Sequence, residues 1–221
     1  IPLEEARTHR VQLDWTAYQP VRPKQMGVQV IPYIPIEEVI PYIHWSFFFL
    51  AWKLNGRFEE LTRIHGCDVC RASWLANIPE KDRSKAEEAM QLYKDASKML
   101  QYLSEIKAEY CRAVYGFFPA KSLGDDIQMG DELLPTLRQQ EKHDGAYKSL
   151  ADYVMPESEG RTDYVGAFAV TGGAGMDYLK AKYEEEGDAY KAMLLQTLAD
   201  RLAEATAEYL HAKVRREYWG Y

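Results

Sequence analysis

The chain has 221 residues, of which 47% are hydrophobic, so it can bury a core as one domain or as two small ones. Its 34 acidic and 27 basic residues give a net charge of −7. Lysine and arginine form no cluster against that acidity, which argues against nucleic-acid binding. The richest apolar run, residues 45–52, is much shorter than the ~20 residues of a membrane span, so no membrane association is expected.

The cysteines and the start of the chain indicate a cellular context. Cys67, Cys70 and Cys111 are odd in number and form no disulfide framework. A cytoplasmic protein with free thiols is the simplest interpretation. The chain starts at Ile1, with neither a methionine nor a signal peptide, which suggests a piece cut from a longer polypeptide.

The first 25 residues are interpreted as a linker segment. A short helix is expected within residues 1–10, and Pro20 and Pro23 then keep the chain extended. Residues 27–31 alternate as a strand does.

Two short helices are predicted next. The first starts at Pro35, a favourable first helical position, and ends or kinks at Pro41. The second spans residues 46–54 and is closed by Asn55 and Gly56. Residues 57–83 show little periodicity, so no regular element is predicted there.

A long helix is predicted from Ser84, whose spacing to Glu87 matches a capping box. Apolar residues then recur at three- and four-residue steps from Ala86 to Ile106, which describes one helix face.

Strands and two closing helices are predicted for the second half of the chain. The strands are expected at 112–118, 126–129, 133–139 and 164–171, and the helices at about 176–186 and 188–217. Strands in the middle with helices at both ends favour an α+β fold with an antiparallel or mixed sheet.

Two motifs invite a functional interpretation that their surroundings do not support. The His65-Gly-Cys67-Asp-Val-Cys70 string offers half of a zinc site, but no second half follows, and no βαβ pattern favours a redox pair. We therefore expect neither a metal site nor a redox pair there. The glycines at 172, 173 and 175 lie where phosphate-binding loops occur, but they match neither nucleotide motif, and a tight turn explains them equally well.

Two groups of carboxylates differ in the role that their spacing suggests. Asp125 and Asp126 are adjacent, which suits a turn better than a paired acid and base. Asp200, Glu204 and Glu208 follow one another at four-residue spacing on one helix, and His211 comes three residues later. A solvated face and a site for the ammonium of an amino-acid-like ligand both fit this line. Alanines beside it leave room for a ligand or a second backbone.

Several stretches of unusual sequence carry a resemblance to a known family. They are residues 115–127, 136–140, 150–154, 163–173 and 198–221, the last ending in Tyr-Trp-Gly-Tyr. On these residues the chain closely resembles the C-terminal activation domain of cobalamin-dependent methionine synthase. The resemblance covers almost the whole chain and is interrupted mainly at 57–83, which looks like a local insertion.

The resemblance implies an α+β fold, with a twisted antiparallel sheet flanked by long helices. Residues 26–221 correspond to the activation domain, and residues 1–25 to a linker from a preceding cobalamin-binding module. Members of the family continue beyond the Tyr-Trp-Gly-Tyr string to an Arg-Pro-Ala-Pro-Gly-Tyr type of segment that supplies most ligand contacts. The resemblance therefore implies a domain truncated at its C-terminus, after Tyr221.

The function implied is reactivation of the methyltransferase. The family's domain binds S-adenosylmethionine for the reductive methylation of a cobalamin that the cobalamin-binding module of the same polypeptide holds. A flavodoxin-like protein donates the electron. The isolated chain is not expected to be active alone, and no side chain is expected to act as a general acid or base.

The resemblance also implies individual site residues. Glu204 corresponds to the family's glutamate for S-adenosylmethionine and would anchor its amino group. Asp200 corresponds to an aspartate near the docked cobalamin module. His44 stands where family members often have an aspartate that contacts the ligand.

Two other interpretations stay open. One is a docking or assembly module that contacts a cobalamin domain without binding a small molecule. The other is a stand-alone cytoplasmic protein with a metal at Cys67 and Cys70.

Overall fold

A computed structural model describes residues 1–56, 58–64, 66–106 and 110–221. Its contacts separate two compact units. Unit 1 consists of Ile1–Val30, Val114–Phe168 and Ala212–Tyr221, and unit 2 of Ile31–Ala113 and Ala169–His211. The proposed division into a linker of residues 1–25 and a domain of residues 26–221 stays a prediction.

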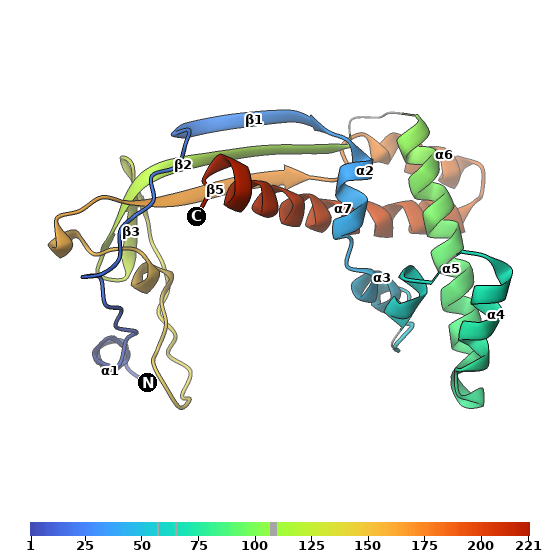
Figure 1. Cartoon of the computed structure of the whole chain (residues 1–221), viewed down its shortest axis with the longest axis horizontal. Helices are drawn as coiled ribbons and strands as arrows, with labels where there is room; N and C mark the ends of the chain where they lie inside the picture. The colour runs from blue at the N-terminus through green and yellow to red at the C-terminus, as the bar shows by residue number, and fades with distance from the viewer. Residues whose placement is uncertain (57, 65, 107–109) are drawn as a thin grey trace. The chain divides into compact units, whose positions relative to one another are not determined.

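One sheet contains the five strands found among the described residues (Figure 1). They are β1 (Gly27–Ile34), β2 (Cys111–Leu123), β3 (Asp126–Met129), β4 (Glu132–Leu134) and β5 (Asp163–Thr171). Their order is β1-β2-β3-β4, and β5 also pairs with β2. The β2–β3 hairpin is antiparallel, with Leu123 opposite Asp126, and its turn uses Gly124 at a φ of 67°. The predicted α+β class is confirmed.

The helices have the following bounds. They are α1 (Leu3–Thr8), α2 (Ile36–Val39), α3 (Trp45–Ala51), α4 (Asp68–Ala76), α5 (Glu80–Glu105), α6 (Met176–Glu185) and α7 (Ala189–Lys213). Short 3-10 segments lie at Ile40–Tyr42, Phe58–Thr62, Leu150–Tyr153 and Glu157–Glu159, and a π-helical turn at Val214–Tyr218 follows α7. No helix of the described chain has both the length and the hydrophobicity that a membrane crossing requires.

The predicted elements are largely confirmed, with four corrections, of which the last concerns the end of α3. Helix α4 lies inside the segment for which no regular element was expected. Helix α5 begins at Glu80 after Pro79, so Ser84 lies within the helix and does not cap it. The predicted strand at 133–139 is wrong beyond Leu134, because the chain there turns to bring Thr136 and Arg138 against the Asp125–Asp126 turn.

Helix α3 also ends differently from the prediction. Lys53 adopts a left-handed φ of 59°, and its N–H donates to Leu50 O while the N–H of Leu54 donates to Phe49 O. This is a Schellman motif with lysine at the position that glycine usually takes. Leu54 and Phe49 are both buried, as the motif's apolar contact requires. The helix therefore stops before the Asn55-Gly56 pair.

Helix α7 provides the core of unit 2. Leu195, Leu198 and Leu202 are fully buried, which confirms the predicted apolar face. Tyr209, on the same face, donates a hydrogen bond to Glu38 at 2.6 Å and packs edge-on against Tyr42.

The core of unit 1 includes the residues that follow α7. The ring of Tyr218 stacks on that of Tyr115 with centroids 4.9 Å apart, and Trp219 packs against Phe117 at 5.1 Å. The indole N–H of Trp219 also donates to Val21 O at 2.6 Å. The Tyr-Trp-Gly-Tyr string is therefore a packing element, placed by the π-helical turn that ends the helix.

Candidate functional site

The acidic line on α7 is present on the face opposite the buried leucines. Asp200, Glu208 and His211 are exposed, and Glu204 is half-buried. The periodicity of the helix places all four along one side. The structure therefore brings together the carboxylates that the sequence placed on one line.

Glu204 forms an ion pair with Arg201, one turn earlier on the same helix. Its Oε2 accepts a hydrogen bond from Arg201 Nη1 at 2.6 Å. The Arg201 guanidinium lies over the ring of Phe47, 6.0 Å from its centroid, and the His44 ring meets the same ring edge-on at 6.1 Å. These four residues form one group of contacts, which we call the Arg201 cluster.

The Arg201 cluster joins Glu204 and His44, two of the residues that the resemblance implied. His44 immediately precedes α3, where its exposed ring makes no capping hydrogen bond. Sequence reasoning missed Arg201 and Phe47. The i, i+3 spacing of Arg201 from Glu204 was a sequence signal for their ion pair.

Arg201 also has a donor that its surroundings do not satisfy. Its Nε is buried and has no hydrogen-bond partner among the described residues. A buried N–H without an acceptor is costly, so native structures seldom keep one without a reason such as a missing water or ligand. The cluster therefore combines a half-exposed carboxylate with an unsatisfied cationic donor.

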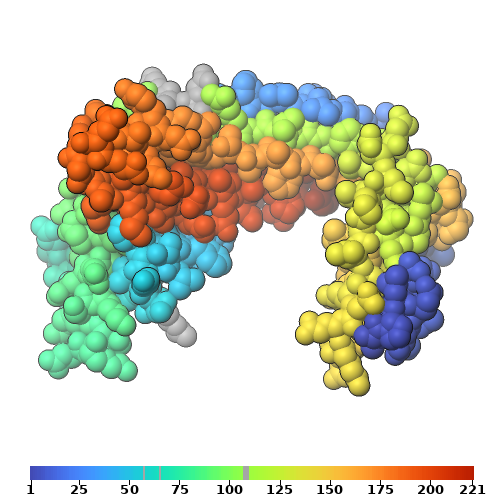
Figure 2. Space-filling view, turned by 180° about the vertical axis from the view of Figure 1, so that it is seen from behind, coloured from blue at the N-terminus to red at the C-terminus, as the bar shows by residue number. Residues whose placement is uncertain are grey.

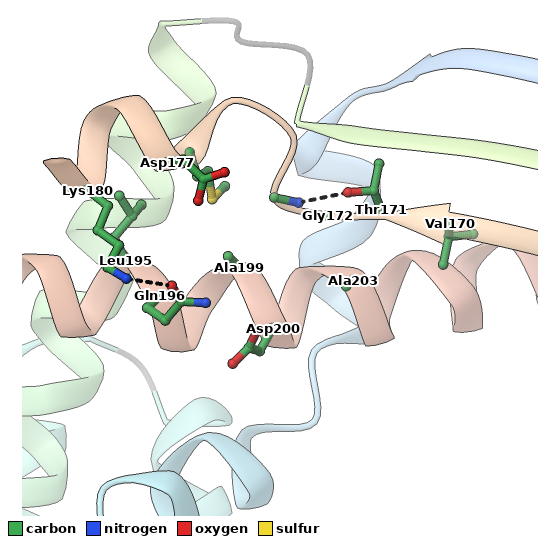
Figure 3. Close-up of a pocket in the computed structure, with 12 residues that line it drawn as sticks. Val170, Thr171, Gly172, Asp177, Lys180, Leu195, Gln196, Ala199, Asp200 and Ala203 are labelled. Atoms are coloured by element: carbon green, nitrogen blue, oxygen red, sulfur yellow. Dashed lines mark hydrogen bonds between the residues drawn. The ribbon is translucent and has the colours of Figure 1, made fainter.

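A cavity of about 270 Å³ lies between α7 and the loop that joins β5 to α6 (Figure 3). Thr171 at the end of β5 and Gly172 of the loop line it, together with Lys180 of α6 and Asp200 of α7. Lys180 Nζ donates to Gln196 Oε1 at 3.2 Å across one side of the cavity. The carboxylate of Asp200 points away from the loop, so it is free to contact a group on the outer side of α7.

The glycines of this loop are explained mainly by close packing. A Cβ on Gly172 would lie 2.2 Å from the backbone nitrogen of Ala203, and one on Gly173 would lie 3.1 Å from Ala199 Cβ. Gly175 alone of the three has a positive φ, at 80°. The backbone of the loop therefore packs against Ala199 and Ala203, as one of the two expectations for these alanines had it.

Asp125 and Asp126 have structural roles, as the adjacency argument favoured, but Asp125 binds side chains. Its Oδ1 accepts a hydrogen bond from Arg138 Nε at 2.8 Å, and its Oδ2 accepts one from Arg7 Nε at 2.8 Å. Arg138 also forms a bidentate pair with Asp152, at 2.7 and 2.9 Å. We call these four residues the Arg138 cluster.

The Arg138 cluster shifts the pKa of its members. Burial would raise the pKa of Asp125, but the hydrogen bonds from Arg7 and Arg138 outweigh burial and lower the pKa below its ordinary value. The pKa of Arg138 is raised, mainly by its hydrogen bonds to Asp152. Asp152 also belongs to a genuine capping box with Ser149, the device that had been expected at Ser84.

The cysteine pair lies at the start of α4. Cys67 is the N-cap residue, and its Sγ accepts the N–H of Cys70 at 3.3 Å. His65, the third residue of the metal interpretation, lies outside the described residues. Within the part of the chain that the structure describes, no group of three His, Cys, Asp or Glu side chains is arranged to hold a metal.

Comparison with known proteins agrees with the fold. The model of the family "Vitamin B12 dependent methionine synthase, activation domain" matches residues 35–221. A crystal structure of the MetH reactivation domain bound to AdoHcy superimposes with a TM-score of 0.84 at 39% sequence identity. That similarity covers 100% of this chain and 65% of the other, so the chain spans about two thirds of its relative. Because the family match includes most of the chain, the chain belongs to the activation-domain family of vitamin B12-dependent methionine synthase.

Proposed function

We propose that this chain binds S-adenosylmethionine and presents its methyl group for the reductive methylation of a cobalamin, which another module of the same polypeptide holds. The observation that carries the proposal is the likeness to a reactivation domain bound to AdoHcy, at 39% identity over the whole chain. AdoHcy is the molecule that remains when S-adenosylmethionine has lost its methyl group. The family assignment supports the same reaction.

The Arg201 cluster fits the amino-acid end of this ligand. That end carries an ammonium and a carboxylate on one carbon, so it needs an acceptor and a donor close together. Glu204 supplies a carboxylate with a 41% exposed side chain, and a charge-assisted hydrogen bond from the ammonium would be strong there. The Nε of Arg201 is buried without a partner among the described residues, so it would donate to the ligand's carboxylate once the side chain turns toward the ligand. His44 adds a ring nitrogen at the edge of the cluster.

Asp200 and the cobalamin module complete the proposed reaction. Asp200 lies one turn before Glu204 and points away from the β5–α6 loop, so we assign it the contact with the cobalamin module. Cobalamin, when bound, supplies the nucleophilic metal that accepts the methyl group. The share of this chain is to hold the sulfonium in line and to exclude water from it. A flavodoxin-like electron donor and a cytoplasmic location are parts of the same proposal.

A calorimetric titration with S-adenosylmethionine tests the proposal. We expect Glu204→Gln to weaken binding by roughly 10- to 100-fold, since a hydrogen bond between charged groups contributes about 1.5–3 kcal/mol. Glu208→Gln is the matched control, because it makes the same change one turn later on the exposed face. The titration is run on the 221-residue chain and on the protein as its natural gene encodes it.

The outcomes separate the two candidate functions. Equal affinities of Glu204→Gln and the parent chain would remove Glu204 from the site. No binding in either form of the protein would contradict the cofactor assignment and would support the docking module that makes no small-molecule contact.

A further inference from the structure

Cys67 and Cys70 gain a structural context that the sequence alone did not reveal. A redox pair was not expected from the sequence because no βαβ pattern surrounds the two cysteines. The structure instead places the two cysteines at the N-terminus of α4, where Cys67 is the N-cap residue and Cys70 lies in the first turn. Helix α4 runs beside α5 (Figure 1). Figure 2 shows this part of the chain, in green, at the surface.

The geometry distinguishes the two thiols. The N–H of Cys70 donates to Cys67 Sγ at 3.3 Å, so the Cys67 sulfur is held over the first turn and faces Cys70. Both side chains are partly exposed, whereas Cys111 is fully buried. None of the three is joined in a disulfide within the part of the chain that the structure describes.

The N-cap position of Cys67 favours it as the attacking sulfur of the pair. The partial positive charge of a helix N-terminus and a backbone N–H donor both stabilise an anion at the N-cap. The pKa of Cys70 is raised, mainly by the hydrogen bond between its side chain and Cys67. Asp68, which pairs with Arg71 at 3.7 Å, is fully exposed and weakens this preference only slightly.

The rest of α4 is fixed independently of the sulfurs. Trp74 is 7% exposed, and its Nε1 donates to Glu60 Oε2 at 3.3 Å, which ties α4 to the 3-10 segment at Phe58–Thr62. A bond between the two sulfurs would therefore close within the first turn while the helix stays packed.

We propose that Cys67 and Cys70 form a reversible dithiol–disulfide pair that exchanges with small-molecule disulfides. The Cys67 thiolate attacks one sulfur of the small disulfide, forms a mixed disulfide and releases one thiolate. Cys70 then loses its proton and attacks Cys67 Sγ, which forms the Cys67–Cys70 bond and releases the second thiol. The protein loses two electrons and two protons, and the small disulfide is reduced to two thiols.

Equilibration with mixtures of reduced and oxidised glutathione tests the pair directly. Arg63 and Arg71 flank the two cysteines, so trypsin releases residues 64–71 as one peptide. We expect this peptide to lose two hydrogen masses as the oxidised fraction of glutathione rises, and to regain them on return to reduced glutathione. The peptide that carries Cys111 should remain a free thiol, because that side chain is buried.

Two variants test the order of attack. Cys70→Ser should accumulate the mixed disulfide of Cys67 with glutathione, because the resolving thiol is gone. In Cys67→Ser, glutathione should add to Cys70 about tenfold more slowly than to Cys67 in the first variant. A peptide 64–71 that stays reduced at every glutathione ratio would overturn the proposal. Equal rates in the two variants would overturn the assignment of Cys67 as the attacking sulfur.

Discussion

The molecule contains two clusters of arginine and carboxylate side chains that use the same chemistry to different ends. The Arg138 cluster of unit 1 is saturated. The Arg138 side chain is 0% exposed and donates to Asp125, to Asp152 and to the Tyr147 carbonyl. The Arg201 cluster of unit 2 is not saturated, because Arg201 pairs with Glu204 and keeps a buried Nε without a partner among the described residues.

This difference indicates that Arg138 stabilises the fold, whereas Arg201 has a donor left for a ligand. A buried arginine with every donor satisfied contributes mainly because removing it leaves carboxylates buried and unpaired. A partly exposed pair contributes little to stability, since water screens it. Its spare hydrogen-bonding capacity is then available for binding. The next four predictions concern stability, from the largest expected effect to the smallest, and three of them test this contrast directly.

Replacing Arg138 should destabilise the protein most. In Arg138→Met the carboxylates of Asp125 and Asp152 lose their main partner, and we expect the free energy of unfolding to fall by about 3–5 kcal/mol. Denaturant unfolding measures the loss. Arg7→Met is the control, because it removes a half-exposed arginine from the same Asp125 and should cost far less. Similar losses in the two variants would contradict a structural role centred on Arg138.

Adding a side chain where the β5–α6 loop packs against α7 should have the next largest effect on stability. In Gly172→Ala the new Cβ would meet the backbone of Ala203 and Leu202 at 2.2–2.3 Å, which no side-chain rotation relieves. We expect a loss of about 2–3 kcal/mol in unfolding free energy. Gly173→Ala meets only a side-chain carbon at 3.1 Å and should cost less. A neutral Gly172→Ala would show that α7 has room for a ligand at this point.

Acid should weaken the Arg138 cluster. The pKa of Asp125 is lowered in the folded state, so its contribution is complete above the ordinary value of 3.8 and is lost as the pH falls through the folded-state value. The unfolding free energy, measured from about pH 6 to about pH 3, should therefore decrease at the acidic end of this range. Asp125→Asn should be less stable at neutral pH, and its stability should decrease less steeply with acid. An equally steep decrease in the variant would show that Asp125 is not its source.

Replacing Arg201 should have the smallest effect on stability. Arg201→Met keeps an unbranched side chain over Phe47 and removes the unsatisfied Nε, so we expect unfolding free energy to change by less than about 1 kcal/mol. The same variant should bind S-adenosylmethionine more weakly, because the proposed donor to its carboxylate is gone. A loss of stability as large as that of Arg138→Met would show that the two clusters do not differ in kind.

Features that depend on local periodicity were predictable from the sequence. The buried face of α7 follows from leucines at helical spacing, and β3 lies at the residues expected. The resemblance led to the family, which composition and spacing would not have reached. Its strings at 136–140 and 150–154 contain Arg138 and Asp152, so part of the resemblance reflects a folding network.

Features that depend on tertiary partners were not predictable. Helix α4 has only nine residues and is held by Trp74 and Glu60, a contact that local patterns do not encode. Lys53 ends α3 in a left-handed turn closed by the N–H groups of Lys53 and Leu54, and lysine gives no sequence signal for such a turn. The importance of Arg201 depends on its stacking against Phe47, about 150 residues earlier in the chain.

The central claim is that Glu204 holds the amino group of S-adenosylmethionine, and a double-mutant cycle on that contact tests it most directly. Affinities are measured for S-adenosylmethionine and for an analogue without the α-amino group, each with the parent chain and with Glu204→Gln, in the form of the protein that binds. We expect loss of the amino group to cost roughly 10- to 100-fold in the parent and little in Glu204→Gln, since the two changes remove one hydrogen bond. Losses that simply add would contradict the claim, because they would place the amino group and Glu204 in separate contacts.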